Sequence, residues 1–304
     1  MAIAAIKLLK KDEKIRVVSA DTNRLSPGLY LSDKGYIVPK FTDEKFYDKV
    51  EEIIKKEKIE AVIPALDPIL LDFSIQKERL EKLGAKIIVS DQASIKITRD
   101  KWNTYQKLLD LVPLPRSFTK IEDIDIDFPI FIKPRDGSGS INAYNINNKE
   151  ELDFFYKRVP NPIIQEFLPG KEYTIDCLAD LNGKLLFCIQ RERLETKTGI
   201  SVKGKIVNNK HLQKMAKIIT ENICFNGPFF FQAKEDNNGV PKLTEINPRI
   251  SGTMSLSSSA GPNIHSLSVR MYMGEKITIP EIKYGLYISR YFEDIYLTDE
   301  RLIR

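Results

Sequence analysis

The pattern of apolar residues changes about a third of the way along this chain, and that change limits the folds it can adopt. Up to about residue 95, short β-branched runs alternate with segments of helical spacing. Beyond residue 112, alternating apolar and polar runs are joined in pairs by short turns. Strands that alternate with helices predict a parallel sheet, whereas paired runs around a turn predict antiparallel hairpins. We therefore expect two regions of different structural class.

The first region has the periodicity of a Rossmann-like layer, which is a parallel sheet with helices on both faces. Strands are predicted at residues 15–19, 61–65 and 86–89, and helices at residues 2–9, 46–56 and 69–83. Such a layer normally begins with a strand and a glycine-rich turn. Residues 2–9 already have helical character, so we expect the first strand to lie upstream of Met1.

The second region predicts an α+β fold built largely from hairpins. One hairpin is expected at residues 173–190, turning at Leu-Asn-Gly, and another at residues 228–247, turning at Asp-Asn-Asn-Gly. Near the end of the chain, Tyr291, Phe292 and Tyr296 alternate with charged residues. We expect these three aromatic residues to close the sheet.

The composition of the 304 residues argues against several classes of protein. No apolar stretch approaches the roughly 18–20 residues that cross a bilayer, so no membrane partner is expected. Three cysteines without a Cys-x-x-Cys pair exclude a disulfide framework and favour a reducing, cytoplasmic setting. The net charge of +5 is spread along the chain without a basic stripe of interleaved aromatics, so no nucleic-acid partner is expected.

The second hairpin carries a group of oxygen-bearing side chains. Glu245 and Asn247 are two residues apart on a predicted strand and therefore project from one face. The turn places Gln232 of the partner strand on that face too, opposite or diagonal to Glu245. A carboxylate with neighbouring amide oxygens suits Mg²⁺, and Arg249 is placed to clamp a phosphate. A solvated polar face is the alternative interpretation for any one of these residues alone.

A short glycine loop follows the strand predicted at residues 128–134. This strand delivers Lys133, and the loop contains Gly137, Ser138 and Gly139. Small residues let backbone amides approach phosphate oxygens, and the lysine adds positive charge. The loop has neither a Gly-Lys-Ser/Thr ending nor a Gly-x-Gly-x-x-Gly pattern, so a plain turn is the alternative.

A third segment, at residues 165–172, has the character of a nucleoside-binding hinge. Its extended backbone is suited to the edge of an adenine, with apolar side chains against the base, and a later glutamate is suited to ribose hydroxyls. A domain hinge with surface charges is the alternative interpretation. The residues concerned are Gln165, Glu166, Phe167, Leu168 and Glu172, together with Lys101 as a further cation.

In this order, these segments resemble the ATP-grasp superfamily. The motif Gln232 followed by Glu-x-Asn-Pro-Arg resembles in particular the large subunit of carbamoyl-phosphate synthase and its single-module relatives. The resemblance covers essentially the whole chain. It implies a Rossmann-like pre-ATP-grasp domain at residues 1–95, a small (lid) subdomain at 96–167, and a large subdomain with the Mg-ATP site at 168–304.

The resemblance also implies a chemistry, because ATP-grasp enzymes transfer the γ-phosphoryl group of ATP to a carboxylate and an amine then attacks the acylphosphate. Lys101 and Lys133 would contact the α- and β-phosphates. Two Mg²⁺ ions, with Mn²⁺ as the alternative, would bind Gln232, Glu245 and Asn247. Arg249, Arg193 and Lys197 would face the transferring phosphoryl group and the acceptor. The amides and hydroxyls of residues 251–255 are suited to the acceptor carboxylate, and a plain Ser/Gly connection between strand and helix is the alternative.

Three functions remain open at this point. The first is a carboxylate–amine ligase that acts on small molecules, with a homodimer as its assembly. The second is a carboxylate or carbamate kinase forming half of a split synthase. Lys197 falls where carbamoyl-phosphate synthase carries a histidine, and this departure counts against carbamoyl phosphate as the product. The third is an ATP-binding regulatory module that has lost turnover.

Overall fold

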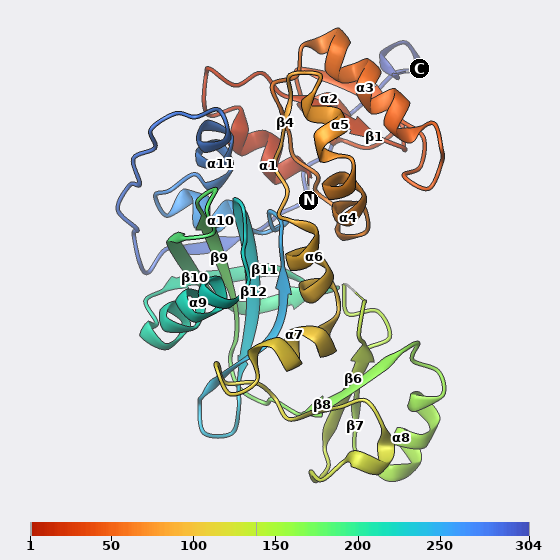
Figure 1. Cartoon of the computed structure of the whole chain (residues 1–304), viewed down its shortest axis with the longest axis vertical. Helices are drawn as coiled ribbons and strands as arrows, with labels where there is room; N and C mark the ends of the chain where they lie inside the picture. Colours follow the sequence, from red (N-terminus) through yellow and green to blue (C-terminus); the bar gives the residue numbers. More distant parts are fainter. Residues whose placement is uncertain (1, 138, 304) are drawn as a thin grey trace.

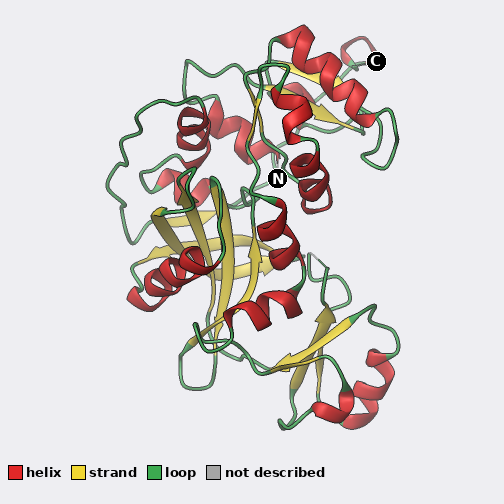
Figure 2. Cartoon of the chain, in the orientation of Figure 1, coloured by secondary structure: helices red, strands yellow, loops and turns green. Residues whose placement is uncertain are grey.

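The computed structural model describes residues 2–137 and 139–303. Three units lie along the long axis of the molecule, and the unit that comes last in the chain lies between the other two (Figure 1). We call them the N-terminal unit, which contains β1 to β4, the small unit, which contains β5 to β8, and the large unit, which contains β9 to β14. Figure 2 shows that helices cover the sheets in each unit. None of the described helices is long and apolar enough to span a bilayer.

The N-terminal unit alternates strands with helices, as its periodicity predicts. Its strands pair in parallel, β1 with β2 and β3 with β4, which confirms the predicted parallel pairing. The single helix predicted at residues 69–83 is wrong in length, since the chain turns at Gln76 and forms two helices. The elements are α1 (Ala2–Leu9), β1 (Val18–Asp21), α2 (Gly28–Leu31), β2 (Lys34–Ile37), α3 (Phe46–Glu57), β3 (Ala61–Val62), α4 (Asp67–Ile75), α5 (Lys77–Glu81) and β4 (Lys86–Ile87).

Two capped helices, α6 (Gln92–Arg99) and α7 (Lys101–Leu108), connect this unit to the small unit. The Asp91 carboxylate accepts a hydrogen bond from the Ser94 amide at 2.8 Å, and Asp100 caps α7 in the same way. The small unit is an antiparallel sheet in the order β5-β8-β6-β7. Its elements are β5 (Ser117–Phe118), η1 (Ile121–Asp123), β6 (Ile130–Pro134), β7 (Tyr144–Ile146), α8 (Lys149–Tyr156) and β8 (Pro162–Glu166).

The large unit contains a six-stranded sheet in the order β13-β12-β9-β10-β11-β14. Both hairpins predicted from the sequence are present, and β10 continues beyond its expected end at residue 190. The elements are β9 (Glu172–Ala179), β10 (Leu185–Lys197), β11 (Ile200–Val207), α9 (Lys210–Asn222), β12 (Pro228–Glu235), β13 (Pro241–Asn247), α10 (Ser255–Ser259), α11 (Ile264–Tyr272), β14 (Tyr287–Ser289) and η2 (Asp299–Arg301).

The aromatic residues near the end do not close this sheet, and that expectation is wrong. Tyr291, Phe292 and Tyr296 lie after β14 and are 81%, 96% and 82% exposed. The chain beyond β14 instead runs back to the N-terminal unit, where the Ile303 amide donates a hydrogen bond to the Tyr30 hydroxyl.

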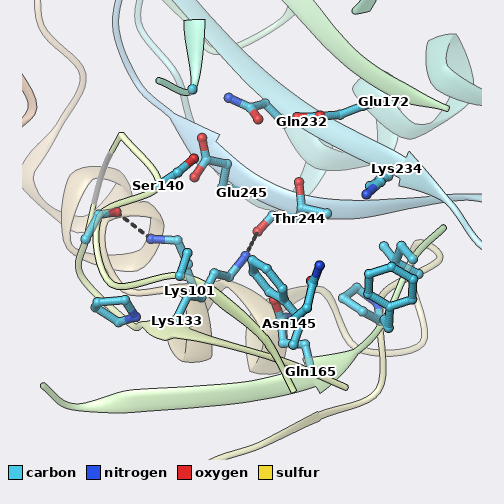
Figure 3. Close-up of a pocket in the computed structure, with 18 of the residues that line it drawn as sticks. Lys101, Lys133, Ser140, Asn145, Gln165, Glu172, Gln232, Lys234, Thr244 and Glu245 are labelled. Carbon is cyan, nitrogen blue, oxygen red and sulfur yellow. Dashed lines mark hydrogen bonds between the residues drawn. The ribbon is translucent and has the colours of Figure 1, made fainter. Parts of the chain in front are cut away.

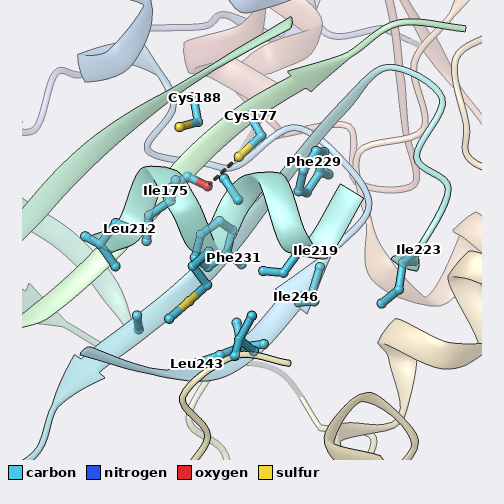
Figure 4. Packing of buried hydrophobic residues seen from close by; sticks show 14 of the residues in the cluster. Ile175, Cys177, Cys188, Leu212, Ile219, Ile223, Phe229, Phe231, Leu243 and Ile246 are labelled. Carbon is cyan, nitrogen blue, oxygen red and sulfur yellow. Dashed lines mark hydrogen bonds between the residues drawn. The ribbon is translucent and has the colours of Figure 1, made fainter. Parts of the chain in front are cut away.

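Alternation along the central strands decides what each face of the large sheet does. Ile175 and Cys177 of β9, with Phe229 and Phe231 of β12, pack under α9 in the main apolar core (Figure 4). Residues between them point to the opposite face, where Leu178 packs beneath α10 and α11. Further along β12, the face opposite α9 carries polar side chains that point toward the small unit.

A β-bulge in β13 changes this alternation at one position. Ala233 pairs with Leu243, whereas the preceding residue, Gln232, pairs with Glu245, so Thr244 is an extra residue in β13. Leu243 therefore belongs to the apolar core, while Glu245 faces the other way although it is two residues further on. The bulge places Glu245 toward the small unit.

Candidate active site

A cavity of about 360 Å³ lies between the sheets of the small and large units. β6 and β8 supply one wall, and β9, β10, β12 and β13 supply the other (Figure 3). The residues predicted from the sequence that line this cavity are Lys101, Lys133, Gly137, Gly139, Gln165, Glu166, Phe167, Leu168, Glu172, Arg193, Gln232 and Glu245.

Three other predicted residues lie elsewhere, and a fourth is not described. Asn247 lines a smaller cavity of about 90 Å³ that shares Lys101, Gly137 and Glu245 with the first. Arg249 and Lys197 do not belong to the described lining of either cavity. Ser138 lies outside the described residues. The fold thus collects most of the predicted set in one place.

Two lysines lie at one end of the cavity, and one of them contacts the glycine loop. Lys101 Nζ donates to the Gly137 carbonyl at 2.7 Å, and Lys133 Nζ donates to the Thr244 carbonyl at 3.2 Å (Figure 3). Alternation along β6 buries Ile132 in the small unit and turns Lys133 toward the cavity. Burial, together with the nearby Lys101 charge, lowers the pKa of Lys133 to about 8, although Glu245 and Glu172 oppose the shift.

Apolar and cationic side chains line another part of the cavity, after β8. Phe167 and Leu168 lie there, and Lys234 Nζ is 5.6 Å from the centre of the Phe167 ring. The Gln165 amide donates to the Ser117 hydroxyl at 2.9 Å, which fixes that buried side chain. The Glu166 carboxylate accepts hydrogen bonds from Lys242 Nζ at 2.6 and 2.7 Å and so links the small unit to the large unit.

Arg193 crosses the floor of the cavity on the side of the large sheet. Its Nη1 contacts Glu172 Oε1 at 2.7 Å and Gln232 Oε1 at 2.7 Å, and its Nη2 donates to the Gly199 carbonyl at 2.7 Å. Its Nε is buried without a hydrogen-bond partner among the described residues. Burial lowers the pKa of Arg193, while Glu172 opposes the shift.

The predicted same-face arrangement of Glu245 and Asn247 is confirmed. Asn247 Nδ2 donates to Glu245 Oε1 at 3.3 Å, and Gln232 lies directly opposite Glu245 in the strand register. The described residues contain no group of three or more His, Cys, Asp and Glu that could hold a metal. A carboxylate with an amide oxygen fits Mg²⁺, which completes its shell with water and substrate phosphates.

Arg249 connects the large unit to the N-terminal unit. Its Nε donates to Asp67 Oδ1 at 2.5 Å, and its Nη2 donates to Asp67 Oδ2. Asp67 is the first residue of α4, and Arg249 Nη1 donates to the Ile250 carbonyl at 2.9 Å. Asp67 could not be predicted as the partner of Arg249, because no local pattern relates residues so far apart.

The segment at residues 251–255 rests on a buried polar network. The Asp176 carboxylate is fully buried and accepts from Arg191 Nε at 2.6 Å, Ser251 Oγ at 3.0 Å and Ser257 Oγ at 2.5 Å. Arg290 Nη2 donates to the Gly252 carbonyl at 2.9 Å and to Ser255 Oγ at 3.1 Å.

Several residues that line or support the site were not predicted from the sequence. Lys234 is two residues after Gln232 on β12 and therefore projects from the same face. Strand alternation alone would have identified it. Ser140, Asn145, Thr196 and Thr244 also line the cavity. Arg290, which supports residues 251–255, lies outside any regular element and gives no periodic signal. Lys197 is exposed at the end of β10.

Comparison with known proteins gives two family matches within the chain. Residues 2–88 match the family described as "PylC-like, N-terminal domain". Residues 158–293 match the family described as "ATP-grasp in the biosynthetic pathway with Ter operon". The two matches fall on the N-terminal unit and on the end of the small unit with most of the large unit.

The proteins with similar sequences include a ligase and a synthase. The D-alanine–D-alanine ligase of Fusobacterium nucleatum is 35% identical over 108 residues, which cover 35% of this chain and 36% of the ligase. The carbamoyl phosphate synthase large chain of Clostridium botulinum is 26% identical over 320 residues, which cover 95% of this chain and 28% of the synthase. The chain thus spans only 28–36% of the length of these relatives.

A solved structure with the same fold is the biotin carboxylase domain of the Hydrogenobacter thermophilus 2-oxoglutarate carboxylase, in complex with MgADP, ADP and bicarbonate. It has a TM-score of 0.75 and 16% sequence identity, covering 94% of this chain and 70% of that chain. These matches agree with the fold and the cavity: residues 158–293 match an ATP-grasp family, and the chain has an ATP-grasp fold preceded by an N-terminal domain. Over 95% of its length, the chain is similar to part of the carbamoyl phosphate synthase large chain. The predicted fold class is confirmed, whereas the limits at residues 95 and 167 stay predictions.

Proposed function

We propose that this protein is an ATP-dependent carboxylate–amine ligase that forms an amide through an acylphosphate and releases ADP and phosphate. The observation that carries the proposal is the cavity between two α+β units, which gathers Lys101, Lys133, a glycine loop and Glu245. The similarity to a D-alanine–D-alanine ligase and to carbamoyl phosphate synthase supports the same class.

The phosphates of ATP would lie against the two lysines and the glycine loop. Lys101 and Lys133 bring two positive charges to one end of the cavity, and backbone amides near Gly137 and Gly139 add donors. Phosphoryl transfer depends mainly on alignment and on neutralising charge. This arrangement supplies both without a protein nucleophile.

Magnesium fits the end of β13. Glu245 and Asn247 would hold the ion, with phosphate oxygens and water completing the shell. When bound, Mg²⁺ neutralises charge on the β- and γ-phosphates.

The nucleoside would occupy the hinge end of the cavity. We assign the base to the backbone of residues 165–168, with Phe167 and Leu168 against its face, and the ribose hydroxyls to Glu172. Arg193 holds the Glu172 carboxylate in place at 2.7 Å.

The acceptor would lie beyond the phosphates, near Arg249 and residues 251–255. A carboxylate oxygen attacks the γ-phosphorus, the bond from that phosphorus to the β,γ-bridging oxygen breaks, and ADP leaves. The amine nitrogen then attacks the acyl carbon, the C–O bond to phosphate breaks, and the amine loses a proton. We assign Arg249, Arg193 and Lys197 to the transferring phosphoryl group and the acylphosphate, with Arg290 supporting the acceptor segment.

The test is ADP release with Mg-ATP against a panel of amino acids and other carboxylic acids, each with and without candidate amines. Glu245→Ala serves as the blank, and Glu195→Ala is the matched control, because Glu195 pairs with Lys203 on the surface of β10 and β11. ADP release that requires one acid and one amine supports the ligase. ADP release that persists in Glu245→Ala would contradict the assignment of the site.

A carboxylate or carbamate kinase is the second candidate, because the similarity to carbamoyl phosphate synthase covers 95% of this chain. A stable phosphorylated product formed without an amine would favour it. Tight ATP binding without ADP release under any mixture would instead indicate a regulatory module.

We further propose a homodimer in the cytoplasm. Multi-angle light scattering of the purified protein measures its mass in solution. A mass of one chain at every protein concentration would contradict the dimer.

A further inference from the structure

The guanidinium of Arg193 occupies a position that bears on the number of metal ions in this site. Gln232 is one of three residues that the sequence assigns to metal, yet its Oε1 accepts a hydrogen bond from Arg193 Nη1 at 2.7 Å. Arginine has no acceptor atoms, so the amide oxygen of Gln232 must face it. A cation therefore already lies at the oxygen that a metal would need.

Arg193 is held firmly in that position. Its side chain is only 5% exposed and contacts three acceptors on three different elements or turns, namely Glu172, Gln232 and the Gly199 carbonyl. Figure 3 shows Gln232 and Glu172 next to each other on the wall formed by the large sheet. Removing the guanidinium would leave the Glu172 carboxylate without its ion-pair partner.

One donor of Arg193 is left without a partner. Its Nε is buried and has no hydrogen-bond partner among the described residues. A buried unsatisfied donor is unfavourable unless a ligand supplies an acceptor. A phosphate oxygen of the nucleotide is such an acceptor, so Arg193 has the means to do what a metal ion does there.

The charge balance of the cavity agrees with a single metal ion. Among the carboxylates that line it, Glu166 is paired with Lys242 and Glu172 with Arg193, which leaves Glu245. The lysines of the lining are Lys101, Lys133 and Lys234, and none forms an ion pair with a described residue. ATP with one bound Mg²⁺ has two negative charges. Together with the negative charge of Glu245, these balance the three positive charges of the lysines. A second Mg²⁺ would leave an excess of two positive charges.

We propose that this site binds one Mg²⁺, at Glu245 and Asn247, and that the Arg193 guanidinium replaces a second ion at Gln232 and binds the phosphates directly. The inference rests on the proposed function, since it assumes that ATP binds in this cavity. It assigns Gln232 to holding Arg193 and removes it from the metal ligands.

The test counts Mn²⁺ ions bound per protein by electron paramagnetic resonance, with a saturating non-hydrolysable ATP analogue (AMP-PNP). We expect one ion in the wild type and one in Gln232→Ala. We expect two ions in Arg193→Ala, in which the Gln232 oxygen is released. The double variant Arg193→Ala/Gln232→Ala should return to one ion. Arg116→Ala, which removes an exposed arginine paired with Asp125, is the matched control and should bind one.

Two bound ions in the wild type, falling to one in Gln232→Ala, would overturn the inference and leave the proposed function intact. One ion in a folded Arg193→Ala that still binds AMP-PNP would also overturn it. The wild-type and Gln232→Ala measurements decide the question even where Arg193→Ala does not fold. Failure of the wild type to bind AMP-PNP would contradict the proposed function itself.

Discussion

At the scale of single residues, Lys133 shows how position on a strand sets chemistry. Alternation along β6 directs its side chain into the cavity, where burial and the Lys101 charge lower its pKa from 10.5 to about 8. The pKa of Lys133 is thus lower in the folded chain than in the unfolded chain. At pH values between about 8 and 10.5, the folded chain therefore binds fewer protons than the unfolded chain. The free energy of unfolding therefore rises as the pH rises through this window.

The same shift predicts a pH dependence for ATP. We expect kcat/KM for ATP to fall as the pH rises through about 8, because Lys133 loses the charge that faces the phosphates. The measurement is the pH profile of ADP release. Lys133→Arg keeps its charge at every accessible pH, so its profile should stay flat in that range. An identical fall in this variant would assign the titration to another group.

Glu245 is the residue on which the metal assignment depends most. Glu245→Ala should lower Mg²⁺-dependent turnover by about 100-fold or more, since it removes a charged ligand from the site of transfer. The fold should survive, because the side chain lies at a cavity and not in the apolar core. Turnover and the thermal unfolding midpoint are measured together. Unchanged turnover would remove the assignment.

Glu172 should affect binding more than chemistry. Glu172→Ala is expected to raise KM for ATP by about 10-fold, as a hydrogen bond to a charged group contributes about 1.5–3 kcal/mol. The value of kcat should change less, because the ribose is remote from the transferred group. Steady-state kinetics with varied ATP measure both quantities. A loss of kcat at constant KM would contradict the ribose assignment.

At the scale of elements, β9 and β10 bury an ion pair that supports the acceptor segment. Asp176 and Arg191 are 0% and 1% exposed, and Asp176 also holds Ser251 and Ser257. Two central strands thereby fix residues 251–255 through side chains on the face opposite α9. The bulge in β13 acts at the same scale, because it alone turns Glu245 away from the core.

Breaking the ion pair between Asp176 and Arg191 should lower the free energy of unfolding strongly. Asp176→Ala should lower the free energy of unfolding by about 3–5 kcal/mol, because it leaves the buried Arg191 charge uncompensated. Urea unfolding monitored by circular dichroism measures the change. Asp125→Ala removes an exposed partner of Arg116 and should change the free energy by only about 0–1 kcal/mol. Equal effects in the two variants would contradict the argument.

At the scale of the whole molecule, the N-terminal unit takes part in the site. Asp67 at the start of α4 holds Arg249, which follows the strand that carries Glu245 and Asn247. Arg249, which we assign to the transferring phosphoryl group, thus joins the large unit to the N-terminal unit. Lys242 and Glu166 join the small and large units in a similar way at the hinge.

Loss of the ion pair between Asp67 and Arg249 should lower kcat without weakening ATP binding. Asp67→Asn is expected to lower kcat by about 10–100-fold, because a misplaced catalytic group costs rate steeply, while KM for ATP stays nearly constant. ADP release with varied ATP is the measurement. Asp48→Asn, at an exposed pair with Arg79 in the same unit, is the control. A parallel rise in KM would indicate that Asp67 instead affects the nucleotide site.

Features that depend on neighbours within a few residues could be predicted from the sequence alone. Periodicity predicted parallel pairing in the first region and both hairpins in the second, and it placed Glu245 and Asn247 on one face. These properties follow from strand alternation and turn chemistry, which act locally. Residues on a predicted strand, such as Lys133, could therefore be selected in advance.

Contacts between groups that are distant in the sequence follow only from the packing of the three units. Arg249 and Asp67 are 182 positions apart, and Arg193 reaches Gln232 over 39 positions and across a third strand, β9. The bulge at Thr244 and the exposure of the aromatic residues after β14 also escaped the sequence pattern. Such contacts depend on how whole sheets pack and on how burial balances charge, and no spacing along the chain encodes either.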